Sequence, residues 1–164
     1  MGALLSLLAT ETMTHRPPGS SSAAAIATDV QPLGPADVGA AAALWEAAAL
    51  TRPWNDPRAD FHAALGCPTA AVLGRRDGDT LVGTVMAGFD GHRGWLYYLA
   101  VAPGRRGEGI GRALVAAAEA WLEGQGASAV RLMLRDGNEA GGFYRALGYD
   151  AQAVTVWGRP LRGG

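Results

Sequence analysis

The chain has 164 residues, of which 49% are hydrophobic, and this predicts one globular domain that buries a core without disulfide bonds. The 14 basic and 15 acidic residues give a net charge of −1, which argues against broad electrostatic binding to nucleic acid. All the basic residues are arginines, so mechanisms that need a catalytic or phosphate-binding lysine are excluded.

Residues 1–23 begin with a short apolar run and then become polar and proline-containing, which predicts a flexible tail before a domain over 24–164. No apolar run is long enough to cross a membrane, and no basic segment precedes the first one. We therefore expect no membrane partner and no secretory signal. The single cysteine, Cys67, cannot form an intramolecular disulfide, which fits a cytoplasmic location.

The first half of the domain predicts a short strand, two helices and three strands. The strand falls in 24–33, a helix in 34–50, and a shorter helix at the end of 51–66, after two prolines. Residues 69–101 contain three apolar runs, and the Asp77-Gly78 dipeptide between two of them is a strong hairpin signal. We expect these three strands to be antiparallel.

The second half predicts a helix over about 109–123, a strand at 128–134, a short helix in 138–148 and a closing strand in 150–161. The first of these helices is a crossover, so the strands at 95–101 and 128–134 should be parallel neighbours. The order predicts an α+β fold, a mixed central sheet flanked by helices.

A glycine-rich stretch with two arginines lies between a predicted strand and the crossover helix, within "YYLAVAPGRRGEGIGRAL" at 97–114. A helix start leaves backbone N–H groups without internal partners and carries partial positive charge. Gly107, Gly109 and Gly111 let a bulky anion approach these amides, and Arg105 and Arg106 add positive charge. The stretch therefore predicts a pyrophosphate-binding loop.

Two common phosphate motifs do not fit this loop. The dinucleotide fingerprint would need a glycine where Arg112 stands, and the P-loop would need a lysine. The pattern R-x-x-G-x-G, formed by Arg106, Gly109 and Gly111, closely resembles the acetyl-CoA loop of the GNAT acyltransferase family. The alternative is a glycine-containing helix cap with surface arginines.

A second stretch, "RLMLRDGNEAGGFYRALGYD" at 131–150, resembles the other GNAT signature. The residues that match are Phe143, Tyr144, Leu147, Gly148 and Tyr149. The family's asparagine usually lies seven residues before the tyrosine, whereas Asn138 lies six before Tyr144 and Gly137 takes the expected place. "RPWNDP" and "GFDGHRGWLYYLAVAP" further resemble the YpeA-like group of small bacterial GNAT proteins.

This resemblance implies a GNAT fold whose two parallel strands splay apart, with acetyl-CoA as cosubstrate and an amine as acceptor. The acceptor is a small molecule or a protein amino group, and transfer is direct, without a covalent enzyme intermediate. Pantetheine would pair with the backbone of Leu99 to Val101, and an N–H near Val101 would stabilise the developing oxyanion. The predicted cofactor-binding residues are Leu99, Val101, Arg105, Arg106, Gly107, Gly109, Ile110, Gly111, Arg112 and Asn138.

The resemblance makes Tyr144 the candidate acid that donates a proton to the leaving thiolate; alternatively, it is a packed aromatic residue. No carboxylate occupies the strand before the loop, so a water relay that ends on Asp90, His92 or a backbone carbonyl is the candidate base, although Asp90 and His92 also suit a turn. Asp56 lies in the half that usually forms the acceptor side, or it only begins a helix.

Other functional classes remain open from the sequence. A non-catalytic acyl-CoA-binding or interaction module on the same fold is the main alternative, and an unrelated α+β binding domain is the second. The three histidines have no metal-ligand spacing, so no metal is expected. By analogy with GNAT sheets, a homodimer that pairs through the C-terminal strand is a further expectation, with Trp157 as a candidate contact.

Overall fold

The structure is a computed structural model, and it describes residues 29–159 and 161. The expected tail over residues 1–23 lies outside this part. The strands are β1 (Val30–Pro32), β2 (Ala70–Asp77), β3 (Thr80–Phe89), β4 (Gly94–Val101) and β5 (Val130–Arg131). The helices are α2 (Val38–Ala47), α3 (Pro57–Leu65), α4 (Ile110–Gly124) and α5 (Gly141–Arg145), with 3-10 turns η1 (Pro35–Asp37) and η2 (Pro103–Arg105).

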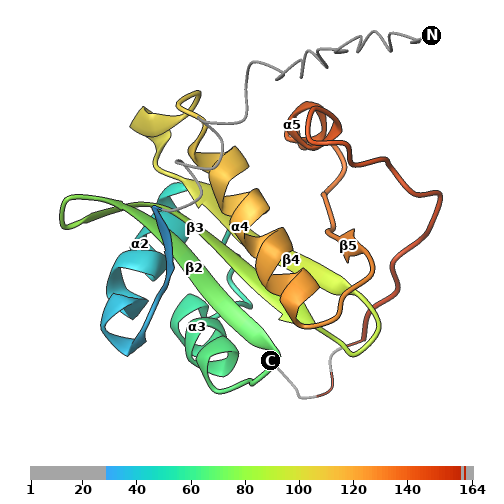
Figure 1. Cartoon of the computed structure of the whole chain (residues 1–164), viewed down its shortest axis with the longest axis horizontal. Coiled ribbons are helices and arrows are strands. Elements are labelled where there is room, and N and C mark those ends of the chain that lie inside the picture. The colour runs from blue at the N-terminus through green and yellow to red at the C-terminus, as the bar shows by residue number, and fades with distance from the viewer. Residues whose placement is uncertain (1–28, 160, 162–164) are drawn as a thin grey trace, which may run out of the picture.

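The five strands form one sheet in the order β1-β2-β3-β4-β5 (Figure 1). The neighbouring strands are antiparallel from β1 to β4, and β4 and β5 are parallel, joined by the crossover helix α4. The predicted α+β class, with a mixed sheet flanked by helices, and the parallel pair are therefore confirmed.

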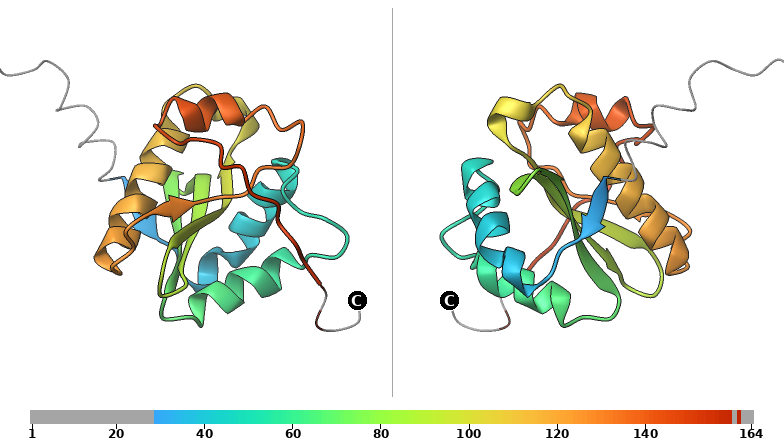
Figure 2. Two further views of the ribbon diagram at one scale, coloured as in Figure 1. Left: turned by 90° about the vertical axis from the view of Figure 1, so that its right-hand side faces the viewer. Right: turned by 60° about the vertical axis from the view of Figure 1, so that its left-hand side comes forward.

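Helices cover both faces of the sheet (Figure 2). One buried cluster joins α4 to the sheet through residues such as Leu73, Val85 and Leu114, and the other joins α2 and α3 to it through Trp45 and Phe61. Along β2 the side chains alternate, with Ala71 and Leu73 in the α4 cluster and Ala70 and Val72 in the other, as the two-residue repeat of a strand requires. The sheet is thus covered on both sides.

The expected closing strand over 150–161 is wrong for the described residues of this stretch, which form neither helix nor strand. Val154 and Val156 are each 67% exposed and Trp157 is 91% exposed. A sequence with high strand propensity forms a strand only where it pairs with a neighbour, and the last strand in the sheet, β5, is two residues long. The homodimer expected through this segment stays a prediction.

Two further elements are shorter than predicted. The strand expected at 128–134 is reduced to β5, because beyond Arg131 the chain turns away from β4 and loses its pairing. The helix expected within 138–148 is only α5, which begins at Gly141, and two successive glycines lower helix propensity there.

Glycines in the strands let the helices lie close to the sheet. A Cβ on Gly83 would lie 2.8 Å from both Ile110 Cγ2 and Leu114 Cδ1, and a Cβ on Gly94 would lie 2.7 Å from Leu122 Cδ1. All three leucine and isoleucine side chains belong to α4 and are buried. The position of α4, and of the loop that precedes it, therefore depends on bare backbone at Gly83 and Gly94.

We expect Gly83→Ala to lower the free energy of unfolding by about 1–3 kcal/mol, because the added methyl overpacks the contact with α4. Urea unfolding measures the change. Gly88→Ala is the matched control in the same strand, since its Cβ would meet no atom closer than Tyr97 Cε2 at 4.0 Å. Equal stability of the two variants would contradict this account of the α4 contact.

Candidate active site

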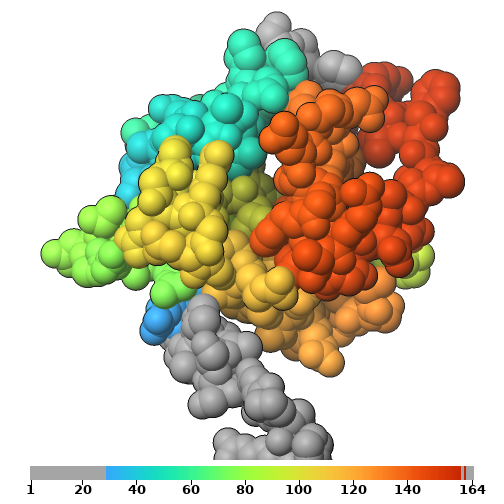
Figure 3. Space-filling model, turned by 90° about the horizontal axis from the view of Figure 1, so that it is seen from above, coloured from blue at the N-terminus to red at the C-terminus, as the bar shows by residue number. Residues whose placement is uncertain are grey.

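A cleft of about 1700 Å³ opens between β4 and the chain that follows β5. Figure 3 shows the hollow between the loop after β4, in yellow, and the orange and red segments that follow β5. The two strands pair only at Gly94 with Val130 and at Trp95 with Arg131. Beyond these pairs the walls separate, and Leu96 to Val101 face Leu132 to Arg135 across the cleft.

Strand β4 carries a bulge where it lines the cleft. Thr84 of β3 lies opposite Ala100 and Met86 lies opposite Tyr97, so Tyr98 and Leu99 together face Val85. Tyr98 has a φ of +50°, a left-handed conformation that is uncommon for a residue other than glycine. Conformations of this kind persist only where the surroundings enforce them, and they cluster at functional sites.

Buried Trp45 holds this bulge in place. Its ring stacks on the ring of Tyr98, with centroids 4.0 Å apart and an interplanar angle of 16°. Its Nε1 donates a hydrogen bond of 2.8 Å to the Thr84 hydroxyl, which in turn donates to the Tyr98 carbonyl at 3.3 Å. Both Trp45 and Thr84 are fully buried, so the bulge is fixed by a polar contact that water does not reach.

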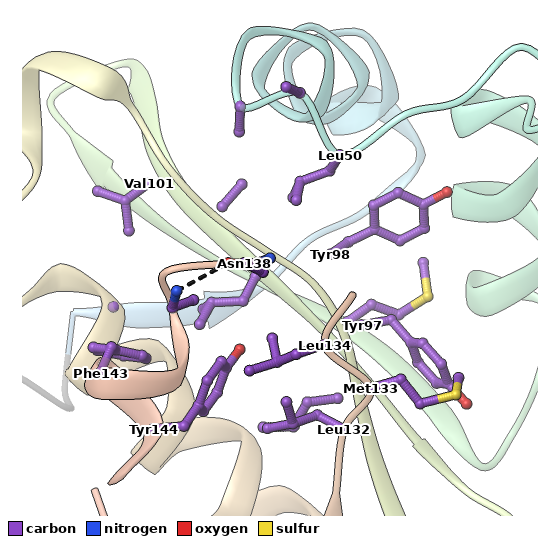
Figure 4. A pocket seen from close by; sticks show the side chains of 18 of the residues that line it. Leu50, Tyr97, Tyr98, Val101, Leu132, Met133, Leu134, Asn138, Phe143 and Tyr144 are labelled. Carbon is purple, nitrogen blue, oxygen red and sulfur yellow. Dashed lines mark hydrogen bonds between the residues drawn. The ribbon is translucent and has the colours of Figure 1, made fainter. Parts of the chain in front are cut away.

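The Tyr98 side chain reaches across to helix α3. Its hydroxyl donates to Asp60 Oδ2 at 2.5 Å, and burial together with this carboxylate raises the pKa of Tyr98. Figure 4 shows Tyr98 on the opposite side of the cleft from Tyr144. Asp60 and Tyr98 lie 38 positions apart in the chain, so no local sequence pattern indicates that they pair.

The start of α4 presents backbone amides to the cleft. Gly109 is the residue before the helix, with a φ of +81°, and no side chain caps it. Gly107 has a φ of +85°, also in the left-handed region. A Cβ on Gly111 would lie 3.3 Å from Phe143 Cζ, so this glycine lets α5 approach α4 closely. Bare backbone and amides without a side-chain cap therefore occur together at the start of α4, and such an arrangement suits an anion.

The arginines of this loop divide into two kinds. Arg105 donates from Nε to the Glu108 carboxylate at 2.8 Å and from Nη1 to Asp77 Oδ2 at 2.6 Å, which raises its pKa. It therefore ties the loop to the end of β2. Arg106 and Arg112 are exposed, line the cleft, and make no ion pair or side-chain hydrogen bond within residues 29–159. Their charges are available to an anion.

Tyr144 lies on the opposite wall, in α5. Its side chain is 8% exposed and packs edge-on against the rings of Phe143 and Tyr149. No fully buried side-chain oxygen in the described residues lacks a partner, so the unpaired Tyr144 hydroxyl keeps access to the cleft that it lines. Burial raises the pKa of Tyr144, which keeps the phenol protonated and able to donate.

A model of the acetyltransferase (GNAT) family matches residues 41–149, a span that holds every residue lining the cleft except Val156. The chain belongs to the GNAT family. An acetyltransferase of Yersinia pseudotuberculosis is 40% identical over 119 residues, which are 72% of this chain and 84% of the relative. An acetyltransferase of Pectobacterium atrosepticum is 40% identical over 126 residues, 76% of this chain and 89% of the relative.

Solved structures share the GNAT fold at lower identity. The aminoglycoside N-acetyltransferase AAC(6')-Iy in complex with CoA is 17% identical, with a TM-score of 0.70 over 82% of this chain and 95% of that one. The aminoglycoside 6'-N-acetyltransferase AAC(6')-IG of Acinetobacter haemolyticus is 19% identical, with a TM-score of 0.67 over 81% of this chain and 99% of that one. This GNAT protein is an acetyltransferase, and acetyl-CoA is its acetyl donor.

The GNAT cleft includes most of the site residues expected from the sequence. They are Leu99, Val101, Arg105, Arg106, Gly107, Gly109, Ile110, Gly111, Arg112, Asn138 and Tyr144. Asn138 uses its side-chain carbonyl to accept the Ala140 N–H at 2.9 Å, the dashed line in Figure 4, so it shapes the turn into α5.

Asp90 and His92 are not among the residues that line the cleft. They lie in the turn between β3 and β4, where Asp90 accepts from the His92 and Arg93 N–H groups and from Trp95 Nε1. These hydrogen bonds, with those from Arg93 and Trp95 the strongest, lower the pKa of Asp90 to about 2. The structure thus supports the turn reading of both residues and does not bring them to Tyr144.

Other candidates from the sequence also lie outside the cleft. The Asp56 side chain accepts hydrogen bonds from the Arg58 and Ala59 N–H groups and caps the start of α3. This is the helix-start role, one of the two roles expected for Asp56 from the sequence. Trp54, which belongs to the RPWNDP stretch that resembles the YpeA-like group, is 74% exposed and does not line the cleft. In the part of the chain that the structure describes, no helix is long and apolar enough to cross a membrane, and no cluster of three metal-ligating side chains occurs.

We expect the side-chain carboxyl carbon of Asp90 to titrate near pH 2 by NMR, because three hydrogen bonds favour the ionised form. The native pKa lies below the unfolded value of about 3.9, so the stability it contributes is complete above that pH and is lost as the pH falls through about 2. Asp90→Asn removes this signal and assigns it. An inflection near pH 4 would contradict the turn geometry.

Proposed function

We propose that this acetyltransferase transfers the acetyl group of acetyl-CoA directly to a primary amine, with Tyr144 as the acid. The observation that carries the proposal is the protonated, unpaired hydroxyl of Tyr144 in the same cleft as the glycine-rich loop. Structural neighbours named as aminoglycoside N-acetyltransferases support an amine acceptor. The acceptor is a small molecule or the amino group of a protein.

The chain offers a matched set of groups for acetyl-CoA. The amides at Gly109 to Gly111 and the free guanidinium groups of Arg106 and Arg112 would bind its phosphates. The cleft wall from Leu99 to Val101 would hold the pantetheine arm. When bound, acetyl-CoA supplies an activated thioester carbonyl, which is attacked by the amine nitrogen and leaves CoA thiol and an amide.

Tyr144 holds a proton at its hydroxyl oxygen, in the cleft that would hold acetyl-CoA, and would donate it to the leaving thiolate. Its raised pKa means that the phenol does not ionise near neutral pH, so it is a donor and not a base. Phe143 and Tyr149 fix the ring by edge-on packing, and Tyr149 is itself held by its hydrogen bond of 2.6 Å to Glu119 of α4. The chain thereby orients the donor before substrates bind.

The overall function is tested by native mass spectrometry of the purified protein with acetyl-CoA, followed by turnover with a panel of amines. The panel contains small primary amines and peptides with a free amino terminus. We expect acetyl-CoA to bind and at least one amine to be acetylated. Binding without acetylation of any amine would contradict the proposal.

We expect Gly109→Ala to raise the acetyl-CoA dissociation constant about tenfold. A side chain at a φ of +81° costs about 1–2 kcal/mol, and relief of that strain would move the amides of the loop. Isothermal titration calorimetry measures the affinity. Gly104→Ala is the control from the same loop, because Gly104 has no positive φ and its Cβ would meet no atom within 4 Å. Unchanged affinity in Gly109→Ala would count against the phosphate loop.

We expect Tyr144→Phe to lower kcat by about 100-fold and to change the acetyl-CoA dissociation constant by less than about twofold, because only the donated proton is lost. Steady-state kinetics and calorimetry give the two values. Tyr149→Phe is the comparison: it removes a hydroxyl bonded to Glu119, outside the cleft, and weakens the packing that orients Tyr144 but leaves its proton in place, so we expect a smaller loss of kcat. Full activity of Tyr144→Phe would remove it as the acid.

A further inference from the structure

One carboxylate lines the cleft from helix α3, on a different element from the phosphate loop. Among the described residues, Asp60 and Glu139 are the acidic side chains that line the cleft. Glu139 comes just before α5, on the wall that carries Tyr144, whereas Asp60 belongs to α3 and is half-buried. The cleft thus has a separate acidic group at the α3 end, which the proposed cofactor contacts do not use.

The Asp60 carboxylate has one oxygen occupied and one open. Oδ2 accepts the Tyr98 hydroxyl at 2.5 Å, while Oδ1 accepts no hydrogen bond within residues 29–159. Because the pKa of Tyr98 is raised, the phenol stays protonated and remains the donor in this pair. The open oxygen is a free acceptor in a concave site.

The position of this carboxylate is coupled to the strand that would hold the thioester. Tyr98 directly precedes Leu99 in β4, and its ring is stacked on buried Trp45. Its backbone is fixed at the bulge by the Thr84 hydroxyl. The Tyr98 ring, which is stacked on Trp45, therefore holds the Asp60 carboxylate in place relative to β4.

Arg52, a cation that lines the same cleft, does not pair with the Asp60 carboxylate. Its Nη1 donates to the carbonyls of Ala49 at 3.0 Å and Thr51 at 2.7 Å. In the part of the chain that the structure describes, no ion pair joins Asp60 to any arginine. Its negative charge is therefore available to a ligand.

We propose that Asp60 binds the ammonium group of the acceptor, so that the acceptor is a primary amine that carries a positive charge at neutral pH. Tyr98 is the positioning residue that orients the carboxylate. The inference rests on the proposed amine transfer. An alkylamine with a pKa near 10.4 binds as the ammonium ion, and charge-assisted hydrogen bonds to a carboxylate are short and strong. Loss of one proton to water then gives the neutral amine that attacks.

The test uses Asp60→Asn, which removes the charge and keeps an oxygen that can accept the Tyr98 hydroxyl. The probes are tyramine, which is cationic at neutral pH, and 4-methylaniline, a primary amine that is uncharged there. We expect KM for tyramine to rise at least about tenfold, because one ion pair is lost. We expect kcat/KM for 4-methylaniline and the acetyl-CoA dissociation constant to change by less than about twofold.

Asp79→Asn is the matched control. Asp79 lies in the exposed turn between β2 and β3 and does not line the cleft. This variant changes the net charge by the same amount as Asp60→Asn, and we expect KM for tyramine and kcat/KM for 4-methylaniline to stay unchanged. Tyr98→Phe keeps the Asp60 charge, and we expect a smaller rise in KM for tyramine. An unchanged KM for tyramine in Asp60→Asn, or an equal loss with both amines, would overturn the assignment.

Failure of the proposed function gives a different result. In that case the wild-type protein binds acetyl-CoA and acetylates neither these two amines nor any other amine or peptide of the panel. Calorimetric binding of tyramine to the CoA-loaded protein then decides the role of Asp60 without turnover. Affinity that is at least tenfold weaker in Asp60→Asn supports the assignment. Equal affinity in the two proteins, or no binding of tyramine to the wild type, overturns it.

Discussion

The contact between Trp45 and the bulge of β4 sets the shape of the whole cleft. Trp45 belongs to α2, yet its ring stacks on Tyr98 and its N–H holds the Thr84 hydroxyl. The stack keeps Tyr98 in a left-handed conformation that a free chain would leave. The buried indole of Trp45 fixes both the bulge of β4 and the Tyr98 side chain. A helix that packs on one face of the sheet therefore helps to determine the shape of the cleft.

The charges around the cleft serve different purposes, although they are all arginine or carboxylate. Arg105 is neutralised by Glu108 and Asp77 and holds the loop to the sheet, whereas Arg106 and Arg112 are left exposed beside free amides. Exposed ion pairs contribute little stability, so the value of Arg105 lies in fixing the loop. The chain thereby keeps the loop in place without using the charges that an anion would need.

Local signals predicted the parts of this molecule that neighbouring residues decide. The Asp77-Gly78 turn and the glycines before α4 lie within a few positions of the structure they cause. The strand expected over 150–161 failed, because a strand depends on a distant partner that no local pattern reveals. The pairing of Asp60 with Tyr98 was missed for the same reason, since a single aspartate on a short helix resembles an ordinary first-turn acid.

Strands β4 and β5 share only two residue pairs, at Gly94 and Trp95, before they separate. Beyond these pairs, the main-chain groups of β4 that line the cleft have no partner in β5. A ligand with amide groups along its length would form hydrogen bonds to these groups and would connect β4 to the chain that follows β5. Such a molecule would stabilise the fold as well as react. When it leaves after each turnover, the contact between β4 and the chain that follows β5 would be less stable.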